Sequence, residues 1–472
     1  MLKNRKKILS LAVVAGFLLF AYGVYYAWQV VTIGSAYKAK ILCSGVFVSK
    51  RDQQDVLQED FEAVFSNINA KIDFDKKSVT TTAAGIPTQT AIFREGLGCA
   101  LIPDSSASEA LHLISDSEWK QSPENTTQSA SGFRSLSKDI QKKVSSDKLS
   151  KAIDKAFEEK DPSHPIRTRA VVVIYKGKII AERYASGFSA DTPLPGWSMA
   201  KSVTNALVGI LVKEKRLSLD RPVQIPEWSG ANDLRKKITL DQLLRMSSGL
   251  EFDERAGPFV SDVNRMLLRS RDASAYAIGK KLRYSPGSRW QYSSGTTIII
   301  SRIIRNSFDG RTTDYHAFPR KALFDKINMT SAVMEVDVSG NFIASSFMHA
   351  TARDWARLGL LYLQDGVWNG ERILPPGWVD YTRRPSSTAP DGKYGAHFWT
   401  NGTAEMEDSA RPFKDLPADA FLASGYEGQN IVIVPSQELV VVRLGMTKER
   451  NTWDIATFVA EILAAISAEV KE

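Results

Sequence analysis

Cysteine and histidine are scarce in this chain of 472 residues, which contains two cysteines and five histidines. No pair of histidines has the spacing of zinc ligands, and Cys43 and Cys99 lie far apart. The lone Gly96-Leu97-Gly98 lacks the third glycine of a dinucleotide-binding loop. The sequence therefore argues against a metalloenzyme and a dinucleotide-dependent enzyme, and we expect neither a metal nor a cofactor.

The chain also has little excess charge beyond its basic N-terminal tail. Its net charge is +8, and four of these charges come from Lys3, Arg5, Lys6 and Lys7. The other basic residues form no dense patch interleaved with aromatics, so we expect no nucleic-acid partner. With 43% hydrophobic residues the chain can bury a sizeable core, and its length predicts roughly two to four domains.

The region after the basic tail lacks charge altogether. Residues 8–37 contain no charged side chain, and residues 8–33 are densest in apolar ones. About 20 apolar residues cross a bilayer, and aromatic side chains mark its interfaces. We expect residues 8–33 to be a single-pass anchor in the inner membrane, with its aromatic belt at Tyr22, Tyr25, Tyr26 and Trp28. The tail 1–7 then faces the cytoplasm, and the remaining chain faces the periplasm or the extracellular side.

Two other interpretations of this apolar run are weaker. A signal peptide cleaved near Gly34-Ser35-Ala36 would have an apolar core of only about 7–15 residues, which is much shorter than this run. A buried helix of a soluble domain is disfavoured because no helical polar face interrupts the run.

Both cysteines follow the predicted anchor and lie within one short region. Outside the cytoplasm a disulfide between Cys43 and Cys99 can persist. In the chain-entropy model such a bridge stabilises the segment by roughly 4 kcal/mol. We therefore expect a disulfide, and the alternative is two separate buried thiols.

Residues 38–118 are predicted to form a small, membrane-proximal α+β segment. Helical spacing of apolar residues extends over residues 55–65. Residues 79–84 and 88–93 are predicted to pair as a hairpin around Gly85-Ile86-Pro87.

A polar linker is predicted over residues 119–147, followed by a larger domain over residues 148–472. Two hairpin signatures lie near the two ends of this domain, around Lys176-Gly177 and Pro435-Ser436. A final helical pattern covers residues 453–466. Strands at both ends with helices between them predict one antiparallel sheet that is assembled from distant segments.

The most informative motif is Ser198-Met199-Ala200-Lys201, an S-x-x-K sequence at the start of an apolar helical pattern. Residues three apart share a helix face, so the Ser198 hydroxyl and the Lys201 amine can meet as nucleophile and base. The positive end of the helix dipole favours an alkoxide there. Keeping a lysine neutral at pH 7 costs roughly 4–5 kcal/mol, so burial or a polar network must lower its pKa. The ordinary alternative is a helix-capping serine and a surface lysine.

Two further motifs offer partners for this pair. Tyr292-Ser293-Ser294-Gly295 lies on a predicted loop before a helix, from which Tyr292 can deliver a phenol. The glycines within residues 424–429 precede a strand and allow close backbone approach to a ligand. Taken singly, the first could be a core tyrosine with a satisfied hydroxyl and the second a plain turn.

Together and in this order, the three motifs resemble those of the serine β-lactamase and penicillin-binding-protein superfamily. That superfamily uses S-x-x-K, then Y-x-N or an equivalent, then K-T-G on a sheet-edge strand. The resemblance covers residues 148–472 and is strongest to the class-C-like branch with the 6-aminohexanoate-dimer hydrolases and family VIII esterases. It implies an α/β (α+β) fold of the β-lactamase/transpeptidase type, in which an antiparallel sheet is flanked by helices and joined by a helical subdomain.

The same resemblance implies a role for each motif residue. Ser198 would be the nucleophile and Lys201 its base partner. Tyr292 would pass the proton to the leaving group and activate water for deacylation. The backbone N–H groups of Ser198 and Gln429 would form the oxyanion hole. The implied substrate contacts are Ser294, Tyr426 and Gly428.

Two departures from the superfamily pattern bear on the substrate. The second motif lacks the asparagine of Y-x-N, and Tyr426-Glu427-Gly428 lacks the lysine of K-T-G. That lysine would hold the carboxylate of a β-lactam, so its absence favours a small-molecule ester or amide substrate. A true β-lactamase or a D-amino-acid peptidase remains an alternative, and no oligomeric state is predicted.

Two rival functions use the same residues differently. In a Ser-His-Asp hydrolase, Ser198 would pair with a histidine, and residues 196–200 are one residue short of G-x-S-x-G. The candidates are His112, His164, His316, His349 and His397. A non-catalytic, membrane-tethered binding module on the same fold is the second rival, and the presence of Ser198, Lys201 and Tyr292 argues against it.

Overall fold

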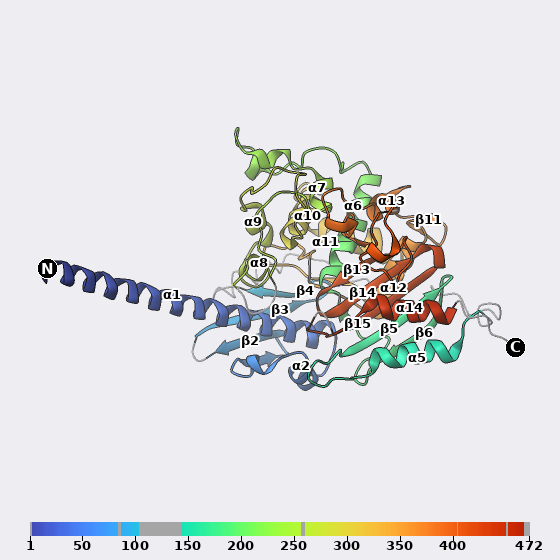
Figure 1. Ribbon diagram of the computed structural model, residues 1–472, viewed down its shortest axis with the longest axis horizontal. Helices are drawn as coiled ribbons and strands as arrows, with labels where there is room; N and C mark the ends of the chain where they lie inside the picture. Colours follow the sequence, from blue (N-terminus) through green and yellow to red (C-terminus); the bar gives the residue numbers. More distant parts are fainter. Residues whose placement is uncertain are drawn as a thin grey trace.

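The computed structural model describes residues 2–83, 86–102, 143–255, 260–403, 405–449 and 452–466. A larger α+β domain carries one long projecting helix at its N-terminus, and a small sheet lies beside that helix (Figure 1). Gly85, His112 and the predicted linker as far as residue 142 lie outside the described residues.

The larger domain is built on a six-stranded antiparallel sheet with the order β12-β13-β14-β15-β5-β6. Its strands are β5 (Thr168–Tyr175), β6 (Lys178–Tyr184), β12 (Trp399–Thr400), β13 (Phe421–Gly425), β14 (Gln429–Val434) and β15 (Leu439–Gly445). The pairs β5–β6 and β14–β15 are the two predicted hairpins. Because β15 pairs with β5, strands from the two ends of the domain join in one sheet. The predicted fold class is thereby confirmed.

Alternating side chains place the sheet between two helical layers. On β5, Val171 belongs to the core that α5 (Ser146–Phe157) and α14 (Ile455–Ile466) cover. The next residue, Val172, points into the opposite core, which includes α12 (Ala352–Leu363). Both faces of the sheet are therefore buried, and functional groups must lie at its edges or ends.

The remaining helices form a subdomain beside the sheet (Figure 1). They are α6 (Ala200–Lys213), α7 (Leu240–Leu244), α8 (Asp262–Arg269), α9 (Ala273–Ile278), α10 (Ser294–Asn306), α11 (Thr312–Pro319) and α13 (Trp378–Arg383). Two small sheets complete the domain. One contains β7 (Leu194–Pro195), β9 (Met348–Ala350) and β8 (Val333–Met334), and the other contains β10 (Val367–Trp368) and β11 (Glu371–Arg372).

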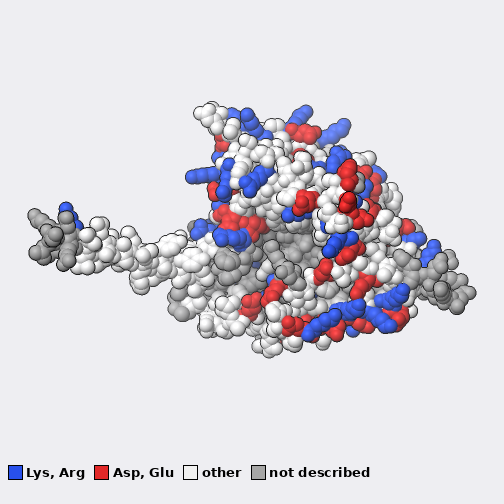
Figure 2. All heavy atoms as spheres, in the orientation of Figure 1, with Lys and Arg blue, Asp and Glu red and all other residues white. Residues whose placement is uncertain are grey.

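Helix α1 is continuous over Leu2–Cys43 and extends ten residues beyond the predicted anchor 8–33. It is the one helix among the described residues that is long and apolar enough to cross a membrane. Residues 7–27 are exposed, and burial begins at Trp28. In Figure 2 the projecting stretch carries no charged side chain between its tip and the domain.

A four-stranded antiparallel sheet lies beside the buried end of α1, with the strands in sequence order. They are β1 (Asn69–Asp73), β2 (Ser78–Ala83), β3 (Ile86–Arg94) and β4 (Gly98–Ile102). The predicted hairpin is present as β2–β3, although Ile86 and Pro87 lie in the strand rather than in the turn.

The helix predicted from the spacing of residues 55–65 is shorter than expected. Helix α2 covers Gln53–Glu59, and a 3-10 turn follows at Ala63–Phe65. The helix ends where the Asp60 carboxylate pairs with Arg51 and Arg169, a tertiary contact that spacing does not reveal.

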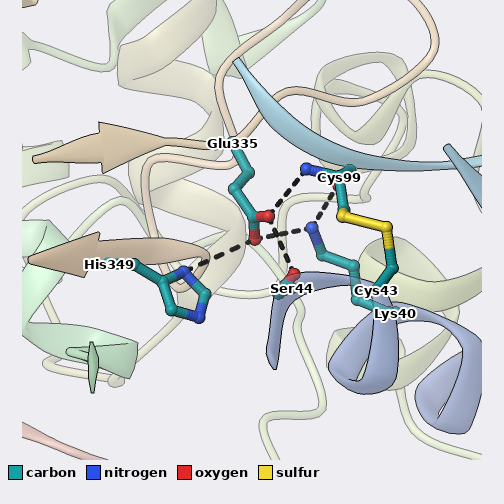
Figure 3. The surroundings of a disulfide bond; sticks show 6 residues. All are labelled: Lys40, Cys43, Ser44, Cys99, Glu335 and His349. Carbon is teal, nitrogen blue, oxygen red and sulfur yellow. Dashed lines mark hydrogen bonds and ion pairs between the residues drawn. A yellow bond between two sulfur atoms is a disulfide. The ribbon is translucent and has the colours of Figure 1, made fainter. Parts of the chain in front are cut away.

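A buried cluster joins the end of α1 to the larger domain (Figure 3). A disulfide links Cys43 to Cys99. Lys40 Nζ lies 2.6 Å from Glu335 Oε2, and Ser44 Oγ and the Cys99 N–H each donate to Glu335 Oε1 at 2.8 Å. Burial opposes ionisation of Glu335, but the charges of Lys40 and His349 and the hydrogen bonds from Lys40 and Cys99 together outweigh it, so the pKa of this carboxyl is below its usual value. The cluster therefore contains a true ion pair between the two parts of the chain.

Candidate active site

The first motif lies on a tight connection between β7 and α6. Trp197 has a φ of 46°, a conformation that non-glycine residues rarely adopt and that is frequent at functional sites. A Cβ at Gly196 would lie 2.3 Å from the Trp355 ring, so only glycine fits before it. This turn presents Ser198 within the 3-10 turn Trp197–Met199 that opens α6, with the hydroxyl near a helix N-terminus.

Lys201 is fully buried one helical turn further on and points at Ser198. Its Nζ lies 2.9 Å from Ser198 Oγ, 3.1 Å from Ser294 Oγ and 3.0 Å from the carbonyl oxygen of Ser345. The three partners are uncharged oxygens, and none is a carboxylate. An amine held in this way faces the serine hydroxyl at the distance that proton transfer requires.

Tyr292 lies on the loop that enters α10, as its motif predicts. Its ring centroid is 4.9 Å from Lys201 Nζ, and the ring stacks on Trp399 at 5.7 Å. The structure thus brings Tyr292 to the Ser198–Lys201 pair through its ring face. Ser294, two residues after Tyr292 in the same motif, is the first residue of α10 and contacts Lys201 directly.

Glu254 is a residue of this site that no sequence motif predicted. The Ser294 Oγ donates to Glu254 Oε1 at 2.6 Å, and the Ser294 N–H donates to Oε2 at 2.7 Å. Burial raises the pKa of Glu254, and the charge of Lys201 and the Ser294 hydrogen bonds oppose that rise. A chain of contacts therefore runs from Glu254 through Ser294 and Lys201 to Ser198. The local sequence does not distinguish Glu254, because the neighbouring Glu251 and Asp253 are acidic as well.

The third motif forms the turn between β13 and β14 and meets the first motif. A Cβ at Gly425 would lie 2.2 Å from the Gly196 carbonyl oxygen, so glycine permits this approach. Tyr426 packs edge-on against Trp197 at 5.5 Å, and Trp197 Nε1 donates to Glu427 Oε2 at 3.0 Å. The turn that carries Gly428 and Gln429 is thereby placed beside the residue that precedes Ser198.

Glu427 and Gln429 have their own local constraints. Glu427 adopts a φ of 63°, is nearly fully buried, and burial raises the pKa of its carboxyl. The side chain of Gln429 is engaged by Gly445, which accepts from Nε2 at 2.6 Å and donates to Oε1 at 3.0 Å. The side chain of Gln429 is therefore turned towards β15.

The histidines do not replace Lys201 beside Ser198. His397 is buried, its Nδ1 lies 3.0 Å from the Lys201 carbonyl oxygen, and burial lowers its pKa to about 3. His316 bonds the Gly340 carbonyl, and His349 faces Glu335. Among the described residues the geometry thus favours a serine–lysine pair over a Ser-His-Asp triad.

Comparisons with known proteins identify the family and the fold of the chain. The model of the beta-lactamase family matches residues 153–463, which is more than half of the chain. The chain therefore belongs to the beta-lactamase family, whose relatives here include serine hydrolases of the β-lactamase fold. It is 25% identical over 310 residues to the 6-aminohexanoate-dimer hydrolase of Paenarthrobacter ureafaciens, covering 60% of this chain and 74% of that one.

Two solved structures show the same fold at low sequence identity. EstCE1, a hydrolase with promiscuous acyltransferase activity, superposes with a TM-score of 0.56 at 15% identity over 70% of this chain and 100% of that one. A family VIII carboxylesterase superposes with a TM-score of 0.52 at 16% identity over 70% and 97%. These similarities concern the fold, and the residues of the site carry the argument about function.

Proposed function

We propose that the protein is a membrane-anchored serine hydrolase that cleaves an ester or amide bond through an acyl-enzyme on Ser198. The observation that carries this proposal is the buried Lys201 amine 2.9 Å from the Ser198 hydroxyl. A buried lysine aimed at a serine on a strained turn has little structural purpose, whereas a nucleophile needs such a base.

In the proposed reaction, Lys201 takes the hydroxyl proton as Ser198 Oγ attacks the substrate carbonyl carbon. The oxyanion is stabilised by the backbone N–H groups of Ser198 and Gln429. Tyr292 delivers a proton to the leaving alcohol or amine as the scissile bond breaks. Water then attacks the acyl-enzyme, the deprotonated Tyr292 oxygen takes the water proton, and the proton held by Lys201 returns to Ser198 Oγ as the acyl bond breaks.

The third motif favours substrates without a carboxylate at that position. Glu427 stands in place of the threonine of K-T-G, and Tyr426 in place of the lysine. A carboxyl and an aromatic ring would not hold the carboxylate of a β-lactam. We propose Ser294, Tyr426 and Gly428 as substrate contacts, and an ester or a linear amide as the substrate, as the names of the esterase and dimer-hydrolase relatives suggest.

The packing of α1 supports an anchor that is retained. Gly34 lies against Ile68, and the carbonyl of Ser35 accepts from Thr81 Oγ1 at 2.8 Å. Cleavage near residues 34–36 would cut α1 in the middle of the segment that packs against the domain. The part of this segment before the cut would then be lost. We propose a single-pass inner-membrane protein with its catalytic domain on the periplasmic or extracellular side. Intact-mass analysis of the exported protein should show residues 8–33 still present.

The experiment that tests the catalytic proposal is active-site labelling. A fluorophosphonate should add to the wild-type protein and not to Ser198→Ala. A panel of short esters, linear amides, D-amino-acid peptides and β-lactams should show Ser198-dependent turnover of esters or amides. Absence of both adduct and turnover would leave the non-catalytic binding module as the better account, and preferential lactam turnover would indicate a true β-lactamase.

A further inference from the structure

The exposed part of α1 matches the thickness of a bilayer core. Residues 8–27 are exposed, and at 1.5 Å per residue they span about 30 Å, the thickness of the hydrocarbon region. Burial of α1 in the domain begins at the next residue, Trp28. Because α1 is one uninterrupted helix as far as Cys43, no linker separates the two parts. The domain is therefore held at a fixed height directly above the membrane.

One side of the active site is connected to α1 at the level of the membrane interface. Arg269 of α8 donates to Gln29 Oε1 at 3.0 Å and lies 4.8 Å from the Trp28 ring. Helix α8 also contacts α10, whose first residue is Ser294.

The other side of the active site meets α1 higher up. Tyr37 lines a cavity of about 30 Å³ together with Trp197 and Glu427. Trp197 immediately precedes Ser198, and Tyr37 is ten residues beyond Ala27, the last exposed residue of the projecting stretch. At 1.5 Å per residue, Tyr37 and the neighbouring Trp197 thus lie about 15 Å beyond the projecting stretch along α1, and Ser198 follows Trp197 in the chain.

We infer that the Ser198 site acts on a membrane-anchored amphiphile whose ester or amide bond projects about 15 Å from the hydrocarbon core. This inference rests on the proposed function. Two aromatic pairs form the rim of the site, Trp197 with Tyr426 and Tyr292 with Trp399, and Tyr426 is 36% exposed. Such a rim suits an apolar acyl or alkyl group. An enzyme and a substrate on the same membrane meet at a high effective concentration. This holds when the scissile bond projects from the membrane to the height of the site.

The test uses the full chain in lipid nanodiscs and one fluorogenic butyrate ester in three forms. In two forms the ester is attached to a phospholipid headgroup, through no spacer or through an oligoethylene glycol spacer that reaches about 15 Å. The third form is the same ester and spacer without lipid. We expect the spaced lipid ester to be hydrolysed about 10-fold or more faster than the soluble one at equal bulk concentration. The unspaced lipid ester should be hydrolysed slowly.

A lifted variant provides the matched control. Eleven residues of an alanine-, glutamate- and lysine-rich helix, inserted between Ala27 and Trp28, add about three full turns and about 16 Å, so the domain keeps its orientation. Hydrolysis of the soluble ester should be unchanged, which shows that the variant is folded, and hydrolysis of the spaced lipid ester should fall about 10-fold. A longer spacer should restore it.

The outcomes separate the inference from the proposal on which it rests. If wild type hydrolyses the spaced lipid ester no faster than the soluble one, or if lifting the domain leaves that rate unchanged, the inference is wrong while the hydrolase remains. If no form is hydrolysed in a Ser198-dependent manner, the proposed function fails as well. Should the lifted variant not fold, the spacer series on wild type decides alone.

Discussion

Two fully buried lysines, Lys40 and Lys201, have different surroundings. Lys40 contacts the Glu335 carboxylate directly at 2.6 Å and joins two parts of the chain. Lys201 contacts two hydroxyls and one carbonyl, and the nearby Glu254 reaches it through Ser294. Lys40 and Glu335 compensate each other's charge, whereas Lys201 has no carboxylate in direct contact and its amine faces the Ser198 hydroxyl. The comparison separates a lysine that holds the fold from one that is suited to chemistry.

The largest expected effect is on the rate of acylation. Lys201→Met should lower it by about 10²–10⁴-fold, because the general base is removed. The melting temperature should stay equal or rise, since an apolar side chain of similar length replaces a buried amine. Stopped-flow labelling with a fluorophosphonate and a thermal melt measure the two quantities. A variant that retains full rate would remove Lys201 from the mechanism.

The matched change at the other lysine should affect stability instead. Lys40→Met leaves Glu335 as a buried charge without its cation, which should lower the free energy of unfolding by about 3–5 kcal/mol. At a temperature where the variant is folded, the acylation rate should equal that of wild type. Denaturant titration with and without the second change Glu335→Met measures the effect, and the double variant should recover much of the loss. A large loss of rate in folded Lys40→Met would erase the distinction between the two lysines.

A smaller effect is expected from the carboxylate one hydroxyl away from Lys201. Glu254→Gln should lower the acylation rate about 10-fold by loosening Ser294. Because burial raises the pKa of Glu254, Glu254→Gln should also remove the part of the pH–rate profile that depends on ionisation of this carboxyl. Glu251→Gln, an exposed change three residues earlier, is the control. Equal profiles for the two variants would show that Glu254 has no positioning role.

The smallest effect concerns the buried carboxyl of Glu427, on which burial acts more strongly than the charges of Lys448 and Arg169. Burial raises the pKa of Glu427, so the folded state binds this proton more tightly than the unfolded state. The group therefore stabilises the fold at low pH, and this contribution is lost as pH rises from about 4.5 through the raised pKa. Glu427→Gln should reduce the fall of the melting temperature over this range by roughly 2–4 °C.

Calorimetry at several pH values measures this change. The exposed variant Glu438→Gln should keep the wild-type pH dependence. If Glu427→Gln also keeps it, burial of the Glu427 carboxyl does not affect its protonation.

Features set by local spacing could be predicted from the sequence. The pairing of Ser198 with Lys201 follows from one helical turn, and the strands around Lys176-Gly177 follow from alternation and turn chemistry. The assembly of the sheet from both ends of the domain followed from the hairpin signatures at those two ends. These relations are either short-range or imposed by burial of a whole sheet face.

Contacts that depend on tertiary packing could not be predicted. Nothing in the local sequence distinguishes Glu254 from Glu251, and only the position of α10 selects it. The pairing of Lys40 with Glu335 joins positions 295 residues apart. The continuation of α1 past residue 33 into a packed core was missed for the same reason, because apolar residues suit both a membrane and a protein interior.

The measurement that tests the central claim most directly is trapping of the covalent intermediate. A slowly deacylated ester should give an acyl adduct on Ser198, located by intact mass and peptide mapping, in wild type and in folded Lys40→Met. The adduct should be absent in Ser198→Ala, strongly reduced in Lys201→Met, and longer-lived in Tyr292→Phe. Ester turnover without any adduct, or an adduct on another residue, would contradict the account.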